Sequence, residues 1–322
     1  MKAAIAVAAF AGLQLAAFAQ SQPMKEVTRE CPEFTAINVA NDFDVTLCQG
    51  NEYLLTLTVD EPLSPYVYAE VKGKILTISY DEKNIPKEIK QQYKKEKLTP
   101  IFRVVITMPI LESVTISNNV VLNSTSPFEC PDKFELTATD KAQVKMLTVS
   151  SRSASLVFLK ESKAVLNMNA VYAVELTTED KADIRITSNC DELVVNSIGS
   201  SKVAATNTSY KLNVAAKGSP MVSVSGSCTS AIVNAEGSSK VTVSGKGSSL
   251  SLKAAKNSTV DAYGLEVENA IIEMTGSAVV NINASDTVEL SVTGGKLTFG
   301  GSPLFKIGKI SKASVTPYGT AD

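Results

Sequence analysis

The sequence predicts an all-β protein, a single-stranded right-handed parallel β-helix (a solenoid) with about 19 residues per coil. An N-terminal β-strand region is expected to cap one end. Two observations support this fold. A small, turn-forming residue returns every 18 to 22 positions between residues 140 and 294, and apolar residues alternate between these turns. A fixed period near 20 residues is typical of solenoids, in which each coil packs on its neighbours.

The turn-forming residues mark one phase of each coil. Gly, Asn and Asp adopt a positive φ at lower cost than other residues, so a column of them indicates a sharp backbone turn at the same place in every coil. The predicted column comprises Asp140, Asp180, Gly199, Gly218, Gly237, Asn257, Gly276 and Gly294, with Ser162 between the first two. We expect these residues to stack along the rod.

Short strands are expected on both sides of each turn. Val222 and Val224 follow one turn, and Leu212 and Val214 precede it. This alternation predicts strands with one buried face, two or three per coil. About nine coils at roughly 4.8 Å each would give a rod about 45 Å long. A β-sandwich is the alternative, but the Asn-Gly and Asp-Gly dipeptides of tight hairpins do not occur between residues 133 and 302.

Composition excludes several function classes. The chain has 322 residues, a net charge of −2, no histidine and no tryptophan. Without histidine there is no Ser-His-Asp triad, no Cys-His pair and no His-ligated metal. The charge gives no electrostatic argument for nucleic acid, which favours a basic face.

The N-terminus predicts export. Residues 1–19 contain Lys2, an Ala-rich apolar segment and the small-x-small sequence Ala17-Phe18-Ala19, which together are typical of a signal peptide cleaved before Gln20. A membrane anchor is the alternative, but an apolar segment of about 17 residues with Gln14 inside it is short for a stable span. The mature chain is expected to lack an integral membrane span and to reside in the periplasm, at the outer-membrane surface or outside the cell.

The five cysteines are of interest because an exported protein can form disulfides. Cys190 and Cys228 share one phase two coils apart, with Ser209 between them. Their expected separation of roughly 9.6 Å exceeds the reach of a disulfide, so we expect three small residues in one column. Cys31 and Cys130 lie in similar contexts, and a bridge between them stays open.

Four segments are expected after the signal peptide. Residues 20–33 form the mature N-terminal segment, 34–132 an N-terminal β region, 133–302 the solenoid and 303–322 a C-terminal cap or tail. Within the β region, residues 84–97 predict a helical insertion with Asn84 as N-cap. Its apolar stripe, Ile85, Ile89 and Tyr93, is expected to dock on the sheet. A basic amphipathic helix that touches a membrane or an acidic polymer is the alternative.

The front half contains a series of strand motifs in a fixed order along the chain. Their residues are Phe34 to Val39, Phe43, Val45, Leu47, Gln49, Gly50, Gly73, Leu76, Ile78, Val104, Ile106, Met108, Pro109, Leu111, Ile116 and Ser117. With these motifs the chain resembles a known family, the autotransporter adhesin head GIN domain proteins of Gram-negative bacteria. The resemblance spans about residues 34 to 300, although Asn118 stands where the family often has glycine. It implies an exported, elongated β-helical protein and transfers no catalytic residue.

The function expected from these observations is a non-enzymatic, adhesin-like or cell-envelope scaffold module that presents flat solenoid faces. A glycan or another envelope component is its expected partner, with self-association open, and no cofactor, metal, catalytic or binding residue is assigned. The alternative is a polysaccharide-cleaving enzyme, because many parallel β-helices cleave pectin. Its best carboxylate candidates are Glu161, Glu179, Asp180 and Asp183, although alternating lysines there are typical of a charge-balanced surface.

Overall fold

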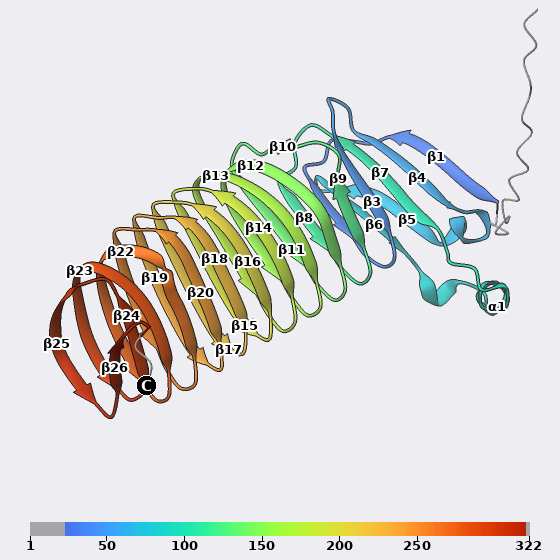
Figure 1. Cartoon of the computed structure of the whole chain (residues 1–322). Helices are drawn as coiled ribbons and strands as arrows, with labels where there is room; N and C mark the ends of the chain where they lie inside the picture. The colour runs from blue at the N-terminus through green and yellow to red at the C-terminus, as the bar shows by residue number, and fades with distance from the viewer. Residues whose placement is uncertain (1–22, 320–322) are drawn as a thin grey trace, which may run out of the picture.

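The computed structural model describes residues 23–319, so the predicted signal peptide, residues 1–19, lies outside the described part. The chain forms a parallel β-solenoid of about 11 turns, about 19 residues apart. Figure 1 shows the coils stacked into a rod, with extra strands and a helix at its N-terminal end. The rod has more coils than the nine we expected because strands of the front half also coil.

Each coil of the central solenoid consists of two strands on opposite walls. Strands that follow the turn column stack as one wall: β14 (Asp183–Asn189), β16 (Lys202–Thr208), β18 (Met221–Ser227) and β20 (Lys240–Lys246). Strands that precede the next turn stack as the other wall: β15 (Glu192–Gly199), β17 (Lys211–Gly218), β19 (Ser230–Gly237) and β21 (Ser249–Ala254). We call the edge with the turn column the turn edge and the opposite edge, where the first wall passes into the second, the bend edge.

Four longer strands run through both walls without a break. They are β12 (Gln143–Phe158), β13 (Lys163–Thr178), β22 (Thr259–Thr275) and β23 (Val279–Thr293). The C-terminal coils are formed by β24 (Lys296–Gly300), β25 (Leu304–Ser311) and β26 (Ser314–Pro317), all paired in parallel. The described part of the predicted C-terminal cap or tail thus continues the ladder.

The ladder also continues towards the N-terminus across residue 133, where we placed the start of the solenoid. The strands concerned are β2 (Ala36–Val39), β3 (Asp44–Gln49), β6 (Ile75–Tyr80), β7 (Phe102–Met108), β8 (Ser113–Ile116), β9 (Val121–Ser124), β10 (Phe128–Glu129) and β11 (Lys133–Ala138). β2 and β3 pair in parallel with β6 and β7 on one side and with β8 and β9 on the other. The coil that comes first in the chain therefore lies second in the stack.

Antiparallel strands close the N-terminal end. β4 (Leu54–Asp60) pairs with β7, β1 (Met24–Glu30) pairs with β4, and β5 (Val67–Lys72) pairs with β6. The short 3-10 helix η1 (Glu61–Tyr66) links β4 to β5. These strands satisfy backbone groups that the outermost coil would otherwise expose, so the predicted N-terminal cap is confirmed.

The predicted helical insertion consists of η2 (Glu82–Asn84) and α1 (Lys87–Glu96). Asn84 is not the N-cap we expected: Asp81 accepts the capping hydrogen bonds of η2, and Pro86 stands at the N-cap of α1 without a side-chain cap. Ile85 and Tyr93 are buried, and the Tyr93 hydroxyl donates to Oδ2 of buried Asp60 at 2.9 Å. Burial and this hydrogen bond raise the pKa of Tyr93. The helix is therefore docked on the β region by its apolar stripe. Within residues 23–319, no helix is long and apolar enough to cross a membrane.

The turn edge shows a column of residues with φ between 57° and 97°, spaced 18 to 20 positions apart. The column comprises Asp140, Lys160, Asp180, Gly199, Gly218, Gly237, Lys256, Gly276 and Gly294. In two coils the position differs from the prediction, with Lys160 in place of Ser162 and Lys256 in place of Asn257. The reason is that hydrogen bonds between coils set the phase: the amide of Lys181, for instance, donates to the Lys160 carbonyl at 2.8 Å. A lysine accepts that conformation at a cost of about 1 kcal/mol.

Candidate functional site: a groove along the bend edge

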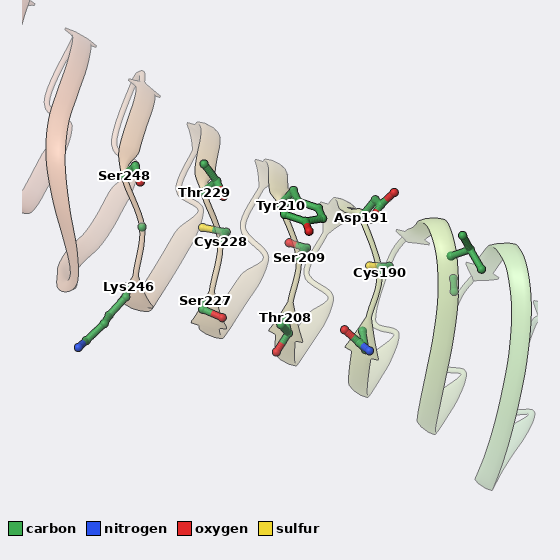
Figure 2. Close-up of a pocket in the computed structure, with 14 residues that line it drawn as sticks. Cys190, Asp191, Thr208, Ser209, Tyr210, Ser227, Cys228, Thr229, Lys246 and Ser248 are labelled. Atoms are coloured by element: carbon green, nitrogen blue, oxygen red, sulfur yellow. The ribbon is translucent and has the colours of Figure 1, made fainter.

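A groove of about 690 Å³ runs along the bend edge across five successive coils. Its position was not predicted, because the sequence shows no motif there. It is lined by Ala170, Val171, Asn189, Cys190, Asp191, Thr208, Ser209, Tyr210, Ser227, Cys228, Thr229, Lys246, Gly247 and Ser248. Figure 2 shows these residues in rows along the stack of coils.

The middle row forms the floor of the groove, and its members are all small. From the N-terminal side it comprises Ala170, Cys190, Ser209, Cys228 and Gly247. Cys190, Ser209 and Cys228 lie in one column, as predicted from their common phase (Figure 2). At roughly 4.8 Å per coil, the four steps from Ala170 to Gly247 make the groove about 19 Å long.

Two polar rows flank the floor. One row, Asn189, Thr208, Ser227 and Lys246, is in direct register from coil to coil. The other row is Asp191, Tyr210, Thr229 and Ser248, and its backbone is fixed by hydrogen bonds between coils. For example, the Thr229 amide donates to the Tyr210 carbonyl at 3.0 Å. The backbone of the groove is therefore as rigid as the solenoid itself.

Two glycines bring the chain into the bend. Gly226 and Gly245 have φ of 137° and 127°, and they pair in register with each other and with Asn207. A Cβ on Gly245 would lie 1.6 Å from the carbonyl oxygen of Gly226, so no other residue fits without a backbone shift. They are 19 residues apart, and this spacing was the one feature from which the sequence could have predicted their role.

A buried amide holds the floor in place. The Asn207 side chain is 3% exposed, its Oδ1 accepts from Ser188 Oγ at 3.0 Å, and its Nδ2 donates to Ser209 Oγ at 2.7 Å. The Ser209 hydroxyl in turn donates to the Lys211 carbonyl at 2.9 Å. The Ser209 hydroxyl already accepts one hydrogen bond and donates another within the protein. The hydrogen-bonding groups that face the groove therefore belong to the outer rows.

Bulkier side chains lie at both ends of the floor row. At the N-terminal end, β13 carries an extra residue relative to β12, and the exposed side chains of Val171 and Tyr172 lie in this β-bulge. At the other end, Val267 Cγ1 lies near the position that a Cβ on Gly247 would occupy. Bulges are common beside functional sites, where they redirect side chains.

The two floor cysteines are protonated at neutral pH. Burial raises the pKa of Cys190 to about 11, and burial also raises the pKa of Cys228. Both thiols are free, as are Cys31 and Cys130. A thiol with a raised pKa is a weak nucleophile, so Cys190 and Cys228 act as small packing residues in the floor.

The carboxylates considered for an enzyme lie at the turn edge, away from the groove. Glu161 is ion-paired with Lys181, whose Nζ lies 3.8 Å from its Oε1. Asp140 pairs with Lys160 in the same way one coil earlier. Asp180 belongs to the turn column itself, with φ of 57°. Asp191 is the one carboxylate among the residues that line the groove.

Comparison with known proteins identifies the family. A family model described as "Putative auto-transporter adhesin, head GIN domain" matches residues 33–222 and 178–303, which together cover most of the chain. None of the curated proteins matches.

Several solved structures resemble the chain. A "putative adhesin" from Parabacteroides merdae is 16% identical, with 91% of this chain and 95% of that chain covered and a TM-score of 0.38. A "putative adhesin" from Parabacteroides distasonis is also 16% identical, with coverage of 92% and 97% and a TM-score of 0.38. A "putative lipid binding protein" from Parabacteroides distasonis is 14% identical, with coverage of 91% and 96% and a TM-score of 0.30.

Proposed function

Because the chain belongs to the head GIN domain family of auto-transporter adhesins, we propose that it is an exported, non-enzymatic adhesion module. In this proposal the solenoid binds a glycan or another polymer of a cell envelope along its outer surface. Residues 1–19 direct it out of the cytoplasm, and the mature chain acts in the periplasm, at the outer-membrane surface or outside the cell. Sequencing the N-terminus of protein purified from its native host tests export, and an intact Met1 would contradict it.

The bend-edge groove is the observation that carries this proposal. Its two outer rows repeat mostly polar side chains at coil spacing over four of its five coils. A polymer laid along the rod would meet an equivalent position at every coil. Weak contacts repeated along one chain sum to a useful affinity, which is how adhesion surfaces bind.

A polysaccharide-cleaving enzyme is the second candidate, and the side chains favour it less. Glycoside hydrolysis uses two carboxyl groups about 5 to 10 Å apart, whereas the groove lining supplies Asp191 alone. The carboxylate of Glu161 is engaged by Lys181 on the opposite edge. Incubation with acidic and neutral polysaccharides, beside a Glu179→Gln variant, separates the two candidates. Adhesion predicts no new reducing or unsaturated ends, and chain cleavage that Glu179→Gln abolishes would favour the enzyme.

Binding of the mature chain, residues 20–322, to immobilised envelope polysaccharides tests the proposal directly. We expect retention that increases with polymer length, because a longer chain occupies more coils. We also propose that the chain can self-associate, and light scattering of the same sample tests this. Failure to retain any envelope polysaccharide at micromolar protein would contradict the adhesion role.

A further inference from the structure

We propose that the bend-edge groove binds one neutral glycan chain parallel to the solenoid axis, with one sugar ring stacked on Tyr210. This inference rests on the proposed adhesion function and adds its site, its ligand class and the orientation of the ligand. Four features of the groove lead to it: an exposed aromatic ring, two rows of free polar groups, a balance of charge and a defined length.

Tyr210 is the aromatic side chain of the groove. Its side chain is 68% exposed, although its backbone amide is fixed by a 2.9 Å hydrogen bond to the Asp191 carbonyl. An aromatic ring that folding leaves in water, on a fixed backbone, loses contact with water when a ligand covers it, and this stabilises the complex. Pyranose sugars match this surface, because one face of the ring presents C–H groups while hydroxyls surround it.

The rows on both sides supply hydrogen-bonding groups for those hydroxyls. Thr208 and Ser227 lie on one side, and Thr229 and Ser248 lie on the other (Figure 2). Asn189 pairs in register with Thr208 and belongs to the same side. None of these five side chains has a hydrogen-bond partner within residues 23–319. Hydroxyl and amide groups both donate and accept hydrogen bonds, as do sugar hydroxyls. The rows can therefore pair with a sugar hydroxyl whether it acts as donor or as acceptor.

Charge in the groove favours a neutral chain. Asp191 lies in the second coil of the groove and Lys246 in the last, three coils apart, and they are the charged residues of the lining. At roughly 4.8 Å per coil they are separated by about 14 Å, so the two charges cancel over the whole groove without pairing. A polyanionic chain would need a row of cations, whereas Lys246 is the one basic residue among those that line the groove.

The ends of the groove define the length of the ligand. Val171 and Tyr172 bulge outward at one end, and Val267 ends the row of small floor residues at the other. Between them the floor is about 19 Å long. A short oligosaccharide therefore fills the groove, and each further sugar within this length adds contacts. We expect affinity to increase with chain length and then to level off once the groove is filled.

Fluorescence anisotropy with labelled oligosaccharides tests this inference. The probes are cellohexaose and chitohexaose as neutral chains, and hexagalacturonate as an acidic chain. The proteins are the mature chain, Tyr210→Ala, Thr229→Val and, as a matched control, Tyr68→Ala. Tyr68 has an exposed ring like that of Tyr210 but lies in β5, far from the groove. Equal melting temperatures establish that all variants fold.

We expect at least one neutral hexasaccharide to bind, with affinity about tenfold lower in Tyr210→Ala and unchanged in Tyr68→Ala. Thr229→Val should weaken binding by a smaller factor, because it removes one hydroxyl. Unchanged affinity in Tyr210→Ala would overturn the site while leaving adhesion elsewhere on the solenoid intact. Binding of hexagalacturonate alone would overturn the ligand class. If the unmodified chain binds none of the probes and no envelope polysaccharide, the site and the proposed function both fail.

Discussion

The two edges of the solenoid differ in what their residues do. At the turn edge the backbone has a positive φ in every coil, and charged side chains pair between coils, as in Lys160–Asp140, Lys181–Glu161 and Lys256–Glu236. At the bend edge the backbone also pairs in register, but the side chains of Thr208 and Ser227 have no hydrogen-bond partner among residues 23–319. The turn edge therefore serves the fold, and the bend edge offers unpaired groups to a ligand.

This difference explains why one edge is visible in the sequence and the other is not. A positive φ restricts residue type, so the same few residues recur at one phase. A row of solvent-facing side chains is restricted by position alone, so its members differ in chemistry from coil to coil. The sequence period predicts where such a row lies. What the row can bind depends on the chemistry of the individual side chains.

Gly245→Ala should have the largest effect on stability. The added Cβ would lie 1.6 Å from the Gly226 carbonyl oxygen at a φ of 127°, so the backbone between the coils has to move. We expect a loss of about 4 kcal/mol in the free energy of unfolding, measured by denaturant titration. Gly308→Ala is the control, because its nearest contact would be 3.4 Å and no positive φ is involved. A similar small loss in both variants would contradict the bend geometry.

Gly237→Val should have the next largest effect and tests the turn edge. Gly237 has a φ of 85°, and a Cβ would lie 2.5 Å from the Gly218 carbonyl oxygen. A β-branched residue is strained there, so we expect a loss of about 2–3 kcal/mol. Ser248→Val, on the exposed rim of the groove, should cost under about 1 kcal/mol. Thermal melts that rank the two variants in the reverse order would show that the edges were assigned wrongly.

Asp140→Asn should have a small, pH-dependent effect. The hydrogen bond from Lys160 lowers the pKa of Asp140 in the folded chain. The interaction therefore contributes to the free energy of unfolding above the pKa of the unfolded chain, near 4. This contribution is lost as the pH falls through the lower pKa that Asp140 has in the folded chain. Asparagine tolerates the same φ, so the substitution removes only the charge. We expect the substitution to cost under about 1 kcal/mol of unfolding free energy at pH 7, and the cost to shrink as the pH falls below about 4. A loss that is independent of pH would mean that the carboxylate acts through packing.

Thiol labelling should report on the groove floor. Burial raises the pKa of Cys190 to about 11, so its thiol stays protonated at pH 8. We expect slow labelling in the folded chain, fast labelling in denaturant and no peptide joining Cys190 to Cys228 on non-reducing mapping. Fast labelling of native Cys190 at pH 8 would contradict a buried floor.

The sequence predicted the period, the fold and most of the turn column, because these depend on local backbone demands. Lys160 and Lys256 were missed because lysine gives no sign of a positive φ, which the hydrogen bonds between coils impose. The stacking order at the N-terminus was missed because β2 and β3 insert between coils that follow them in the chain, and no local pattern encodes this. The groove was missed because its floor and rows combine different residue types, even though the column of Cys190, Ser209 and Cys228 was predicted.

A crystal structure of the mature chain soaked with cellohexaose or chitohexaose would test the central claim most directly. The account predicts density for sugar rings along the bend edge, parallel to the axis, with one ring over Tyr210 and others between Asn189 and Ser248. Density at the turn edge or on the flat walls, with the groove empty, would contradict the division of roles between the two edges.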